Sequence, residues 1–249
     1  MKFVRLEDRN GVAVATLDRA PANALHLEVF EELSQAFKES ESAGAVVLTS
    51  ALPTIFSAGW DLPTVLELDR SGMEDFLDRF CNLIRQIFTF GPPTVIALPG
   101  HAIAGGMILA SAGDERFAGA GKGQLGLSEV LLGATVPECC LEVFRHVVGF
   151  RKMERLASTG ENLSVETARE IGFVDRVTGS EELLDQAVAR ARFLAERPGS
   201  IYAAIKRRAR AAAVARFDQA RKGDPFLDYW FAKEARTRIR ALVEKLKKN

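Results

Sequence analysis

The sequence predicts an α/β fold with a mainly parallel sheet and a helical carboxyl-terminal region. Short apolar runs typical of buried strands, at 45–49 and 94–98, alternate with longer segments of helical apolar spacing such as 73–90. From just past the middle of the chain, almost every segment has the helical period. We therefore expect an α/β core at 1–190 followed by a helical region at 191–249.

The elements of the first half follow one another in a simple order. Asn10-Gly11 is a strong hairpin signal and separates two alternating strand patterns. Gly91-Pro-Pro93 ends the strongly amphipathic helix predicted at 73–90. The predicted elements are strands 2–8 and 11–17, helix 27–39, strand 45–49, a loop at 53–63, helix 73–90, strand 94–98 and a helix that begins at Ala104.

The second half is predicted to be mostly helical. Ser164 is a suitable N-cap for one of these helices, because its side-chain oxygen can accept a hydrogen bond from the first turn. The predicted helices cover 153–158, 164–172, 181–196, 198–222 and 228–248.

Composition excludes several classes of function. Lys and Arg number 33, as do Asp and Glu, so the formal net charge is zero and predicts neither a nucleic-acid nor a membrane partner. The sequence contains no run of 18 or more apolar residues, the length needed to span a bilayer. The amino terminus starts in a strand pattern without signal or transit character, which predicts a cytoplasmic protein.

Cysteine and histidine usage predicts a reducing compartment and no metal. The three cysteines, Cys81, Cys139 and Cys140, are odd in number and two are adjacent, which is a poor disulfide framework. The three histidines are scattered, and no pair has the spacing of zinc ligands.

Two glycine-bearing segments carry the chemical signal. Each follows a predicted strand: Phe56-Ser-Ala-Gly-Trp-Asp-Leu62 in the first case and Ala104-Gly-Gly106 in the second. Glycine lets a backbone approach a ligand closely, and a helix start leaves N–H groups unpaired. Either segment alone could be an ordinary turn. Two such N–H groups directed at one point would form an oxyanion hole, which stabilises charge on a carbonyl oxygen.

Taken together and in order, these segments resemble the enoyl-CoA hydratase/isomerase, or crotonase, family. The resemblance covers most of the chain and is far more specific than one glycine motif. Its segments are Pro21-Ala-Asn-Ala-Leu25, Val46–Ser50, Phe56–Leu62, Pro93–Ala97, Gly100–Gly106, Asp114, Gly126–Gly133 and Ala168–Asp175.

The resemblance implies a spiral of ββα units with carboxyl-terminal helices that assemble a homotrimer or hexamer. It implies acyl-CoA thioesters as substrates, with coenzyme A as part of the substrate and no separate cofactor. The oxyanion donors map to the backbone N–H groups of Trp60 and Gly105. The indole of Trp60 would then be available to narrow the acyl pocket.

The acid/base residues distinguish reactions within the family. Hydratases of the family use two glutamates, whose positions map to Ile108 and Glu129. An isoleucine cannot transfer a proton, so one carboxylate remains at Glu129. This arrangement resembles the Δ3-Δ2-enoyl-CoA isomerases, in which one base moves a proton from C2 to C4. Hydration or another reaction of the family on acyl-CoA is the alternative, and a non-catalytic acyl-CoA-binding subunit is a further one.

Other positions are expected to contact the substrate or its CoA. Lys206 matches a basic residue that the family directs at the CoA phosphates, but a solvated helix face explains it equally well. Glu138 is either a second acid near the substrate or a surface residue. Pro63 and Thr64 stand where relatives often carry a basic residue against CoA. The expected contacts are Ala22, Ala58, Gly59, Asp61, Leu62, Gly106, Ser128 and Lys206.

Overall fold

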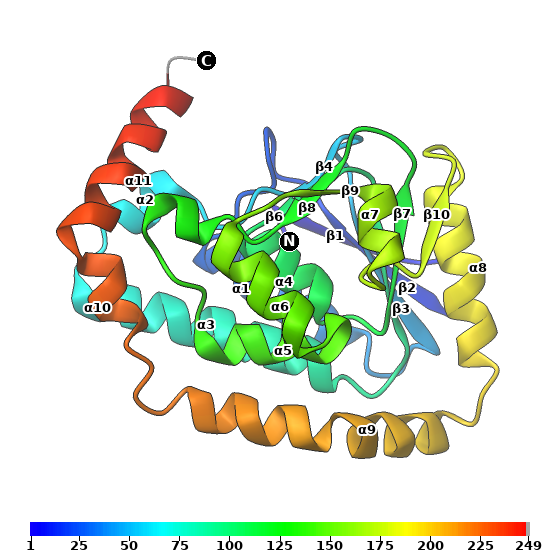
Figure 1. Ribbon diagram of the computed structural model, residues 1–249. Coiled ribbons are helices and arrows are strands. Elements are labelled where there is room, and N and C mark those ends of the chain that lie inside the picture. Colours follow the sequence, from blue (N-terminus) through cyan, green and yellow to red (C-terminus); the bar gives the residue numbers. More distant parts are fainter. Residues whose placement is uncertain (248–249) are drawn as a thin grey trace.

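The computed structural model describes residues 1–247, which form an α/β fold around a six-stranded sheet (Figure 1). This confirms the predicted fold class. The first strand pairs antiparallel to the second, and all later neighbours are parallel. In spatial order the strands are β1 (Val4–Asp8), β2 (Val12–Leu17), β3 (Ala45–Ser50), β5 (Thr94–Leu98), β7 (Glu115–Gly119) and β10 (Arg176–Thr178).

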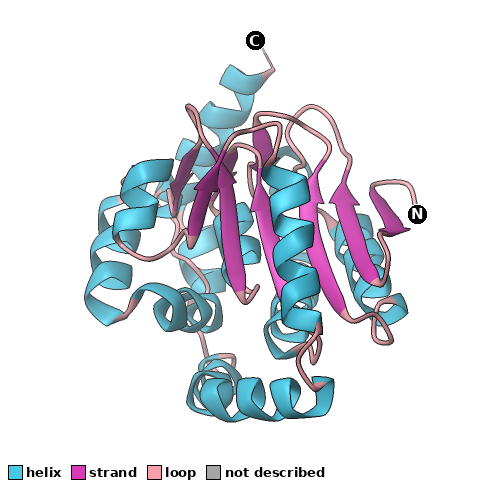
Figure 2. Cartoon of the chain, turned by 90° about the vertical axis from the view of Figure 1, so that its right-hand side faces the viewer, coloured by secondary structure: helices cyan, strands magenta, loops and turns pink. Residues whose placement is uncertain are grey.

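The central strands are buried on both faces because helices cover the sheet from two sides (Figure 2). Successive side chains of a strand point to opposite faces. On β2, Val12 and Val14 pack with α8 (Leu183–Ala195), whereas Leu17 joins the larger core on the other face. Such two-sided burial explains why these strands are continuous apolar runs rather than alternating ones.

The larger core contains the helices that surround the candidate site. The longest of them, α3, starts where Asp69 caps it by accepting a hydrogen bond from Gly72 N at 2.7 Å. Ser164 caps α7 in the same way, as predicted. The helices up to α7 are α1 (Leu27–Glu39), α2 (Leu62–Leu66), α3 (Arg70–Thr89), α4 (Gly105–Ser111), the 3-10 helix η1 (Glu129–Leu132), α5 (Glu138–Val148), α6 (Phe150–Thr159) and α7 (Val165–Glu170).

A second, smaller sheet was not predicted from the sequence. Its strands have only two or three residues each, too few for a period to be visible, and one lies inside the loop predicted at 53–63. Three of them directly follow a strand of the large sheet, so the chain repeats a strand–strand unit. In spatial order they are β4 (Ile55–Ser57), β6 (His101–Ile103), β8 (Gln124–Gly126) and β9 (Leu163–Ser164).

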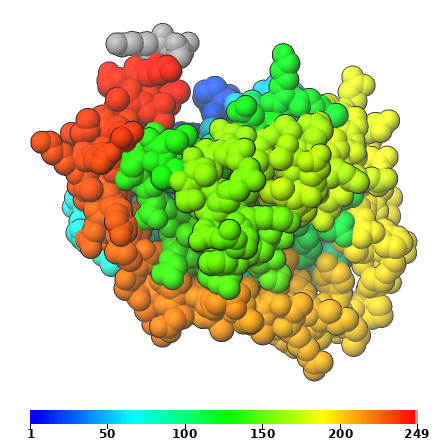
Figure 3. Space-filling model, in the orientation of Figure 1, coloured from blue at the N-terminus to red at the C-terminus, as the bar shows by residue number. Residues whose placement is uncertain are grey.

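The last three helices wrap around one side of the molecule: α9 (Gly199–Ala220), α10 (Phe226–Phe231) and α11 (Lys233–Leu246). Figure 3 shows this segment in orange to red along the lower and left borders of the face. The single helix predicted at 228–248 is wrong, because Ala232 is extended (φ −60°, ψ 140°) and separates α10 from α11. Lys248, its predicted end, lies outside the described residues.

The division into 1–190 and 191–249 stays a prediction. None of the helices described has the length and apolarity needed to cross a membrane.

Candidate active site

Three loops meet at one edge of the small sheet. The strands β4, β6 and β8 are parallel neighbours, with Ser57 paired to Ala102 and Ile103 paired to Gly126. Parallel neighbours place the loops that follow them at the same edge, which is where ligands bind in open α/β sheets. The segments that start with Ala58, Ala104 and Leu127 are therefore brought side by side by the fold.

The backbone of Trp60 is fixed by a bridge to Leu25. Leu25 N donates to Gly59 O at 2.8 Å, and Asp61 N donates to Leu25 O at 2.9 Å. The carbonyl of Gly59 faces Leu25, and the N–H of Trp60 belongs to the same peptide group and points in the opposite direction. The N–H of Trp60 therefore points away from Leu25. Within residues 1–247 this N–H donates no hydrogen bond. It remains available to a ligand.

The Gly105 N–H is the second available donor. It lies at the first residue of α4, after Ala104 with φ 51° and with no side chain capping the helix. The two loops touch, since a Cβ on Gly59 would lie 3.0 Å from Gly105 N. Gly106 permits this approach, because a Cβ there would lie 2.3 Å from Ser57 O. The two N–H groups thus lie in adjacent turns, and their role as oxyanion donors stays a prediction.

A cavity of about 570 Å³ opens beside these two donors. Its walls contain Trp60, Gly105, Ile108 and Glu129, which come from three separate segments of the chain. Gly59 and Gly106 shape the turns without lining the cavity. Of the predicted substrate contacts, the lining includes Ala22, Ala58, Asp61, Leu62 and Ser128.

Glu129 is the acid/base candidate in this cavity. It begins η1, three residues after the end of β8. Its Oε2 atom is buried and has no hydrogen-bond partner among the described residues. Burial away from water raises the pKa of this carboxyl to about 7, because desolvation disfavours the charged form. A group with a pKa near 7 can both accept and return a proton at neutral pH.

The other positions that could transfer protons are occupied differently. Ile108 is buried in the cavity wall on α4. Asp61 also lines the cavity, but its carboxylate lies 2.6 Å from Arg19 Nη2 and accepts from Thr64 N at the start of α2. The described lining residues include two carboxylic acids, Asp61 and Glu129. Asp61 has an ion-pair partner, and Glu129 has none among the residues that the structure describes.

An aromatic cluster forms one wall. The Trp60 ring lies edge-on to Phe76, Phe80, Phe226 and Trp230, with centroids 5.2–6.0 Å apart. Its indole edge packs over the Gly105 α-carbon, where a Cβ would lie 3.0 Å from Trp60 Cδ1. The indole is thus part of the cavity wall.

Sequence reasoning missed the contribution of the last helices to this site. Phe226 and Trp230 of α10 line the cavity together with two leucines of α11, Leu242 and Leu246. The aromatic run 226–231 was the signal that could have identified them. Sequence reasoning also missed Arg19, which lines the cavity and forms an ion pair with Asp61.

Neither expectation for Lys206 holds. Its side chain is 7% exposed, and its Nζ lies 2.8 Å from Asp114 Oδ2 and 3.2 Å from Pro92 O. Arg210 Nη2 lies 2.7 Å from the same carboxylate. Helix α9 therefore docks through a buried ion network, and Lys206 is neither a solvated residue nor part of the cavity. Asp114 therefore has a structural role, as the carboxylate that holds both cations.

Glu138 is an exposed residue at the start of α5, where its backbone N–H donates to Asp224 at 2.8 Å. Its neighbour Pro137 lines the cavity, whereas Glu138 does not. The surface alternative is the one that the structure supports.

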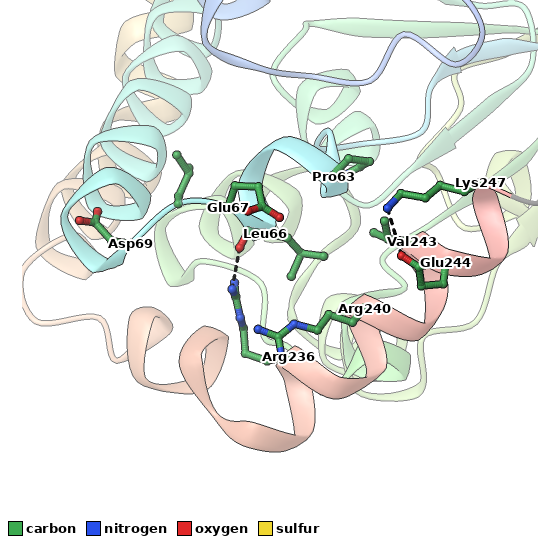
Figure 4. A pocket seen from close by; sticks show the side chains of 10 residues that line it. Pro63, Leu66, Glu67, Asp69, Arg236, Arg240, Val243, Glu244 and Lys247 are labelled. Carbon is green, nitrogen blue, oxygen red and sulfur yellow. Dashed lines mark hydrogen bonds and ion pairs between the residues drawn. The ribbon is translucent and has the colours of Figure 1, made fainter.

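A second hollow, of about 600 Å³, lies between α2 and α11 (Figure 4). It shares Pro63 with the cavity. Arg236 donates from Nη2 to Leu66 O at 2.6 Å, and Arg240 lies one turn further along α11. The hollow therefore adjoins the apolar cavity, and its lining contains both basic side chains and the acidic residues Glu67, Asp69 and Glu244.

The family model for enoyl-CoA hydratase/isomerase matches residues 7–249. The chain belongs to this family. It is 32% identical over 189 residues to the mitochondrial enoyl-CoA delta isomerase 1 of Mus musculus, over 74% of this chain and 65% of the mouse protein. It is 30% identical over 255 residues to a probable enoyl-CoA hydratase of Bacillus subtilis strain 168, over 99% of this chain and 98% of that protein.

Solved structures give the same assignment. The crystal structure of human mitochondrial Δ3-Δ2-enoyl-CoA isomerase matches with a TM-score of 0.92 and 27% identity, covering 99% of this chain and 98% of that one. The crotonase fold predicted from the resemblance is therefore confirmed. Since relatives named as isomerases and as hydratases both match, membership alone does not decide the reaction.

Proposed function

We propose that this family member moves the double bond of an enoyl-CoA from C3 to C2. The observation that supports it is that, among the described residues lining the cavity, Glu129 is the unpaired carboxyl group and an isoleucine, Ile108, stands at the position of the second acid. Hydration must activate a water and also protonate carbon, which two carboxylates perform well. A double-bond shift needs one base that returns the proton it removed.

In the proposed mechanism the thioester oxygen accepts hydrogen bonds from the N–H groups of Trp60 and Gly105. As the C2 proton leaves, negative charge moves onto this oxygen, and both donors are already in place to stabilise it. Loss of one such donor typically slows a reaction by about 10²–10³. The apolar surroundings strengthen these hydrogen bonds because water does not compete.

Glu129 takes the proton from C2 and delivers it to C4 of the dienolate. No net proton is exchanged with solvent, so a buried carboxyl without a water relay is adequate. The raised pKa matches this double role, since the acid and base forms are both populated near neutral pH. Coenzyme A enters as part of the substrate, and the mechanism requires no other cofactor.

The hollow of Figure 4 is our proposed site for the anionic part of CoA, in place of Lys206. Arg236 and Arg240 line this hollow next to Pro63, which it shares with the cavity, and their guanidinium groups would bind the CoA phosphates. Assembly into a trimer or hexamer remains a prediction.

Conversion of a 3-enoyl-CoA to the 2-enoyl product tests the isomerase proposal. Glu129→Gln keeps the shape of the side chain but removes the base, and we expect kcat to fall by about 10²–10⁴. Glu138→Gln is the matched control on an exposed carboxylate and should retain turnover. Undiminished turnover by Glu129→Gln would exclude the mechanism.

Hydration is the second candidate, favoured by the match to the Bacillus subtilis protein along nearly its whole length. Product analysis with both a 2-enoyl-CoA and a 3-enoyl-CoA separates the reactions. A 3-hydroxyacyl-CoA as the main product would establish hydration. Binding of both thioesters without any product would instead indicate a non-catalytic acyl-CoA-binding subunit.

A further inference from the structure

The three cysteines, far apart in the sequence, form one buried cluster. Cys81 lies on α3, and Cys139 and Cys140 lie in the first turn of α5. All three are buried, and their sulfur atoms lie within 4.8 Å of one another. The contact between Cys81 Sγ and Cys139 Sγ is 3.1 Å. Packing of α3 against α5 thus creates a thiol pair that the sequence spacing did not predict.

The surroundings of the cluster favour the thiolate form of one cysteine, Cys139. Hydrogen bonds from Cys140 and Cys81 lower the pKa of Cys139 to about 4, and the nearby Arg221 adds to this. The pKa values of Cys81 and Cys140 are raised above their usual range, by the hydrogen bond to Cys139 in the first case and by burial in the second. Cys139 also lies at the second residue of an 11-residue helix, where backbone N–H groups favour negative charge.

This donor set suits redox chemistry better than metal binding. A metal ion requires deprotonated thiolates as ligands. The raised pKa values of Cys81 and Cys140 favour protonated thiols at these two positions, and the positive charge of Arg221 acts on Cys81 and Cys139. One thiolate in contact with one thiol is instead the arrangement of an attacking and a resolving cysteine.

We propose that Cys139 and Cys81 are a peroxide-reactive pair that forms a reversible disulfide. The Cys139 thiolate attacks one oxygen of hydrogen peroxide, the O–O bond breaks, and hydroxide leaves and is protonated to water. Cys81 sulfur then attacks the sulfenic sulfur, an S–S bond forms, and the S–O bond breaks. The departing hydroxide takes the Cys81 proton. Two thiols are oxidised by two electrons, and one peroxide is reduced to two waters.

The disulfide would connect two walls of the active-site cavity. Phe80, adjacent to Cys81, lines the cavity from α3, and Pro137, two residues before Cys139, lines it at the start of α5. Closing the sulfurs from 3.1 Å to the ~2.04 Å of a disulfide moves these two segments toward each other. Oxidation therefore reduces turnover, and reduction restores it.

Peroxide treatment followed by alkylation and mass spectrometry tests the pairing. We expect one disulfide per chain, a cross-linked peptide that contains Cys81 and Cys139, and one alkylated thiol at Cys140. Because the cluster is buried, glutathione disulfide should react at least ten-fold more slowly than peroxide. Cys140→Ser should still form the disulfide. Cys81→Ser should stop at the sulfenic acid, which dimedone labels at Cys139.

Three results would overturn the proposal. One is a disulfide that includes Cys140 or joins two chains, and another is the absence of any disulfide while the thiols are oxidised further. The third is a one-to-one zinc adduct of the reduced protein, seen by native mass spectrometry, that blocks peroxide. Substrate turnover, or acyl-CoA binding if no turnover is found, must fall on oxidation and return with dithiothreitol. An unchanged value excludes the coupling to the cavity.

Discussion

The buried carboxyl of Glu129 should reduce the stability of the protein as pH rises. The folded state raises its pKa from 4.5 to about 7 through burial. Between these values the unfolded chain releases the proton while the folded chain keeps it. The unfolding free energy therefore falls as pH rises through this interval, and becomes independent of this group above about pH 7.

The size of the effect follows from the pKa values. At 1.36 kcal/mol per pH unit, a carboxyl whose pKa rises from 4.5 to about 7 destabilises the ionised folded state by ~3 kcal/mol. A glutamine has a similar volume and no charge, so Glu129→Gln removes this dependence. The quantity to compare is the unfolding free energy of the variant minus that of the parent protein. We expect this difference to be ~3 kcal/mol larger at pH 7.5 than at pH 4.5.

Urea unfolding of both proteins at several values between about pH 4.5 and 7.5 measures this difference. Glu138→Gln serves as the control, because that side chain is exposed and its difference from the parent should stay constant. If the difference between Glu129→Gln and the parent is the same at both ends of the range, the carboxyl is not desolvated and its proposed role as a base near neutral pH loses its physical cause.

Four further predictions follow from the site and its supports. The kcat/KM of the isomerase should rise with pH to a plateau and reach half its maximum near pH 7, since Glu129 must be ionised to act; a flat profile from pH 5 to 9 contradicts this. Gly106→Ala should lower stability by about 3 kcal/mol or more in thermal unfolding, because its Cβ would meet backbone Ser57 O at 2.3 Å. Asp114→Asn should cost about 3–5 kcal/mol, since two buried cations lose their carboxylate, while kcat of the folded fraction is kept. Arg240→Ala should raise KM for acyl-CoA and leave kcat unchanged in steady-state kinetics, and an unchanged KM removes the hollow of Figure 4 as the CoA site.

The large sheet could be predicted because its strands carry a strong local signal. The runs at 45–49 and 94–98 are apolar on both faces, as strands buried between two layers must be. The small sheet could not, because β4, β6 and β8 have three residues each and owe their conformation to their neighbours. It is nevertheless this small sheet that brings the two donors and Glu129 to one edge.

The turns of the candidate site were predictable where their conformation requires glycine. Glycines at 59, 105 and 106 are required by a positive φ or by close approach, so they mark the donor turns directly in the sequence. Lys206 was misassigned because its pattern, a cation on a helix, does not show which face is buried. Its partner Asp114 is 92 positions away, and only the tertiary fold brings the two together.

The aromatic wall explains how one residue can serve two functions in this site. In the proposed mechanism Trp60 contributes its backbone N–H to the donor pair and its indole to the acyl wall, and the two parts are held by different elements. The bridge to Leu25 holds the backbone, whereas Phe80 and the α10 residues Phe226 and Trp230 hold the ring. Because α10 follows the docked helix α9, the carboxyl-terminal helices help to shape the cavity, while the small sheet positions the two proposed donors and Glu129. The two parts meet where the Trp60 indole packs over Gly105, so a change in the aromatic wall should also affect the proposed donor geometry.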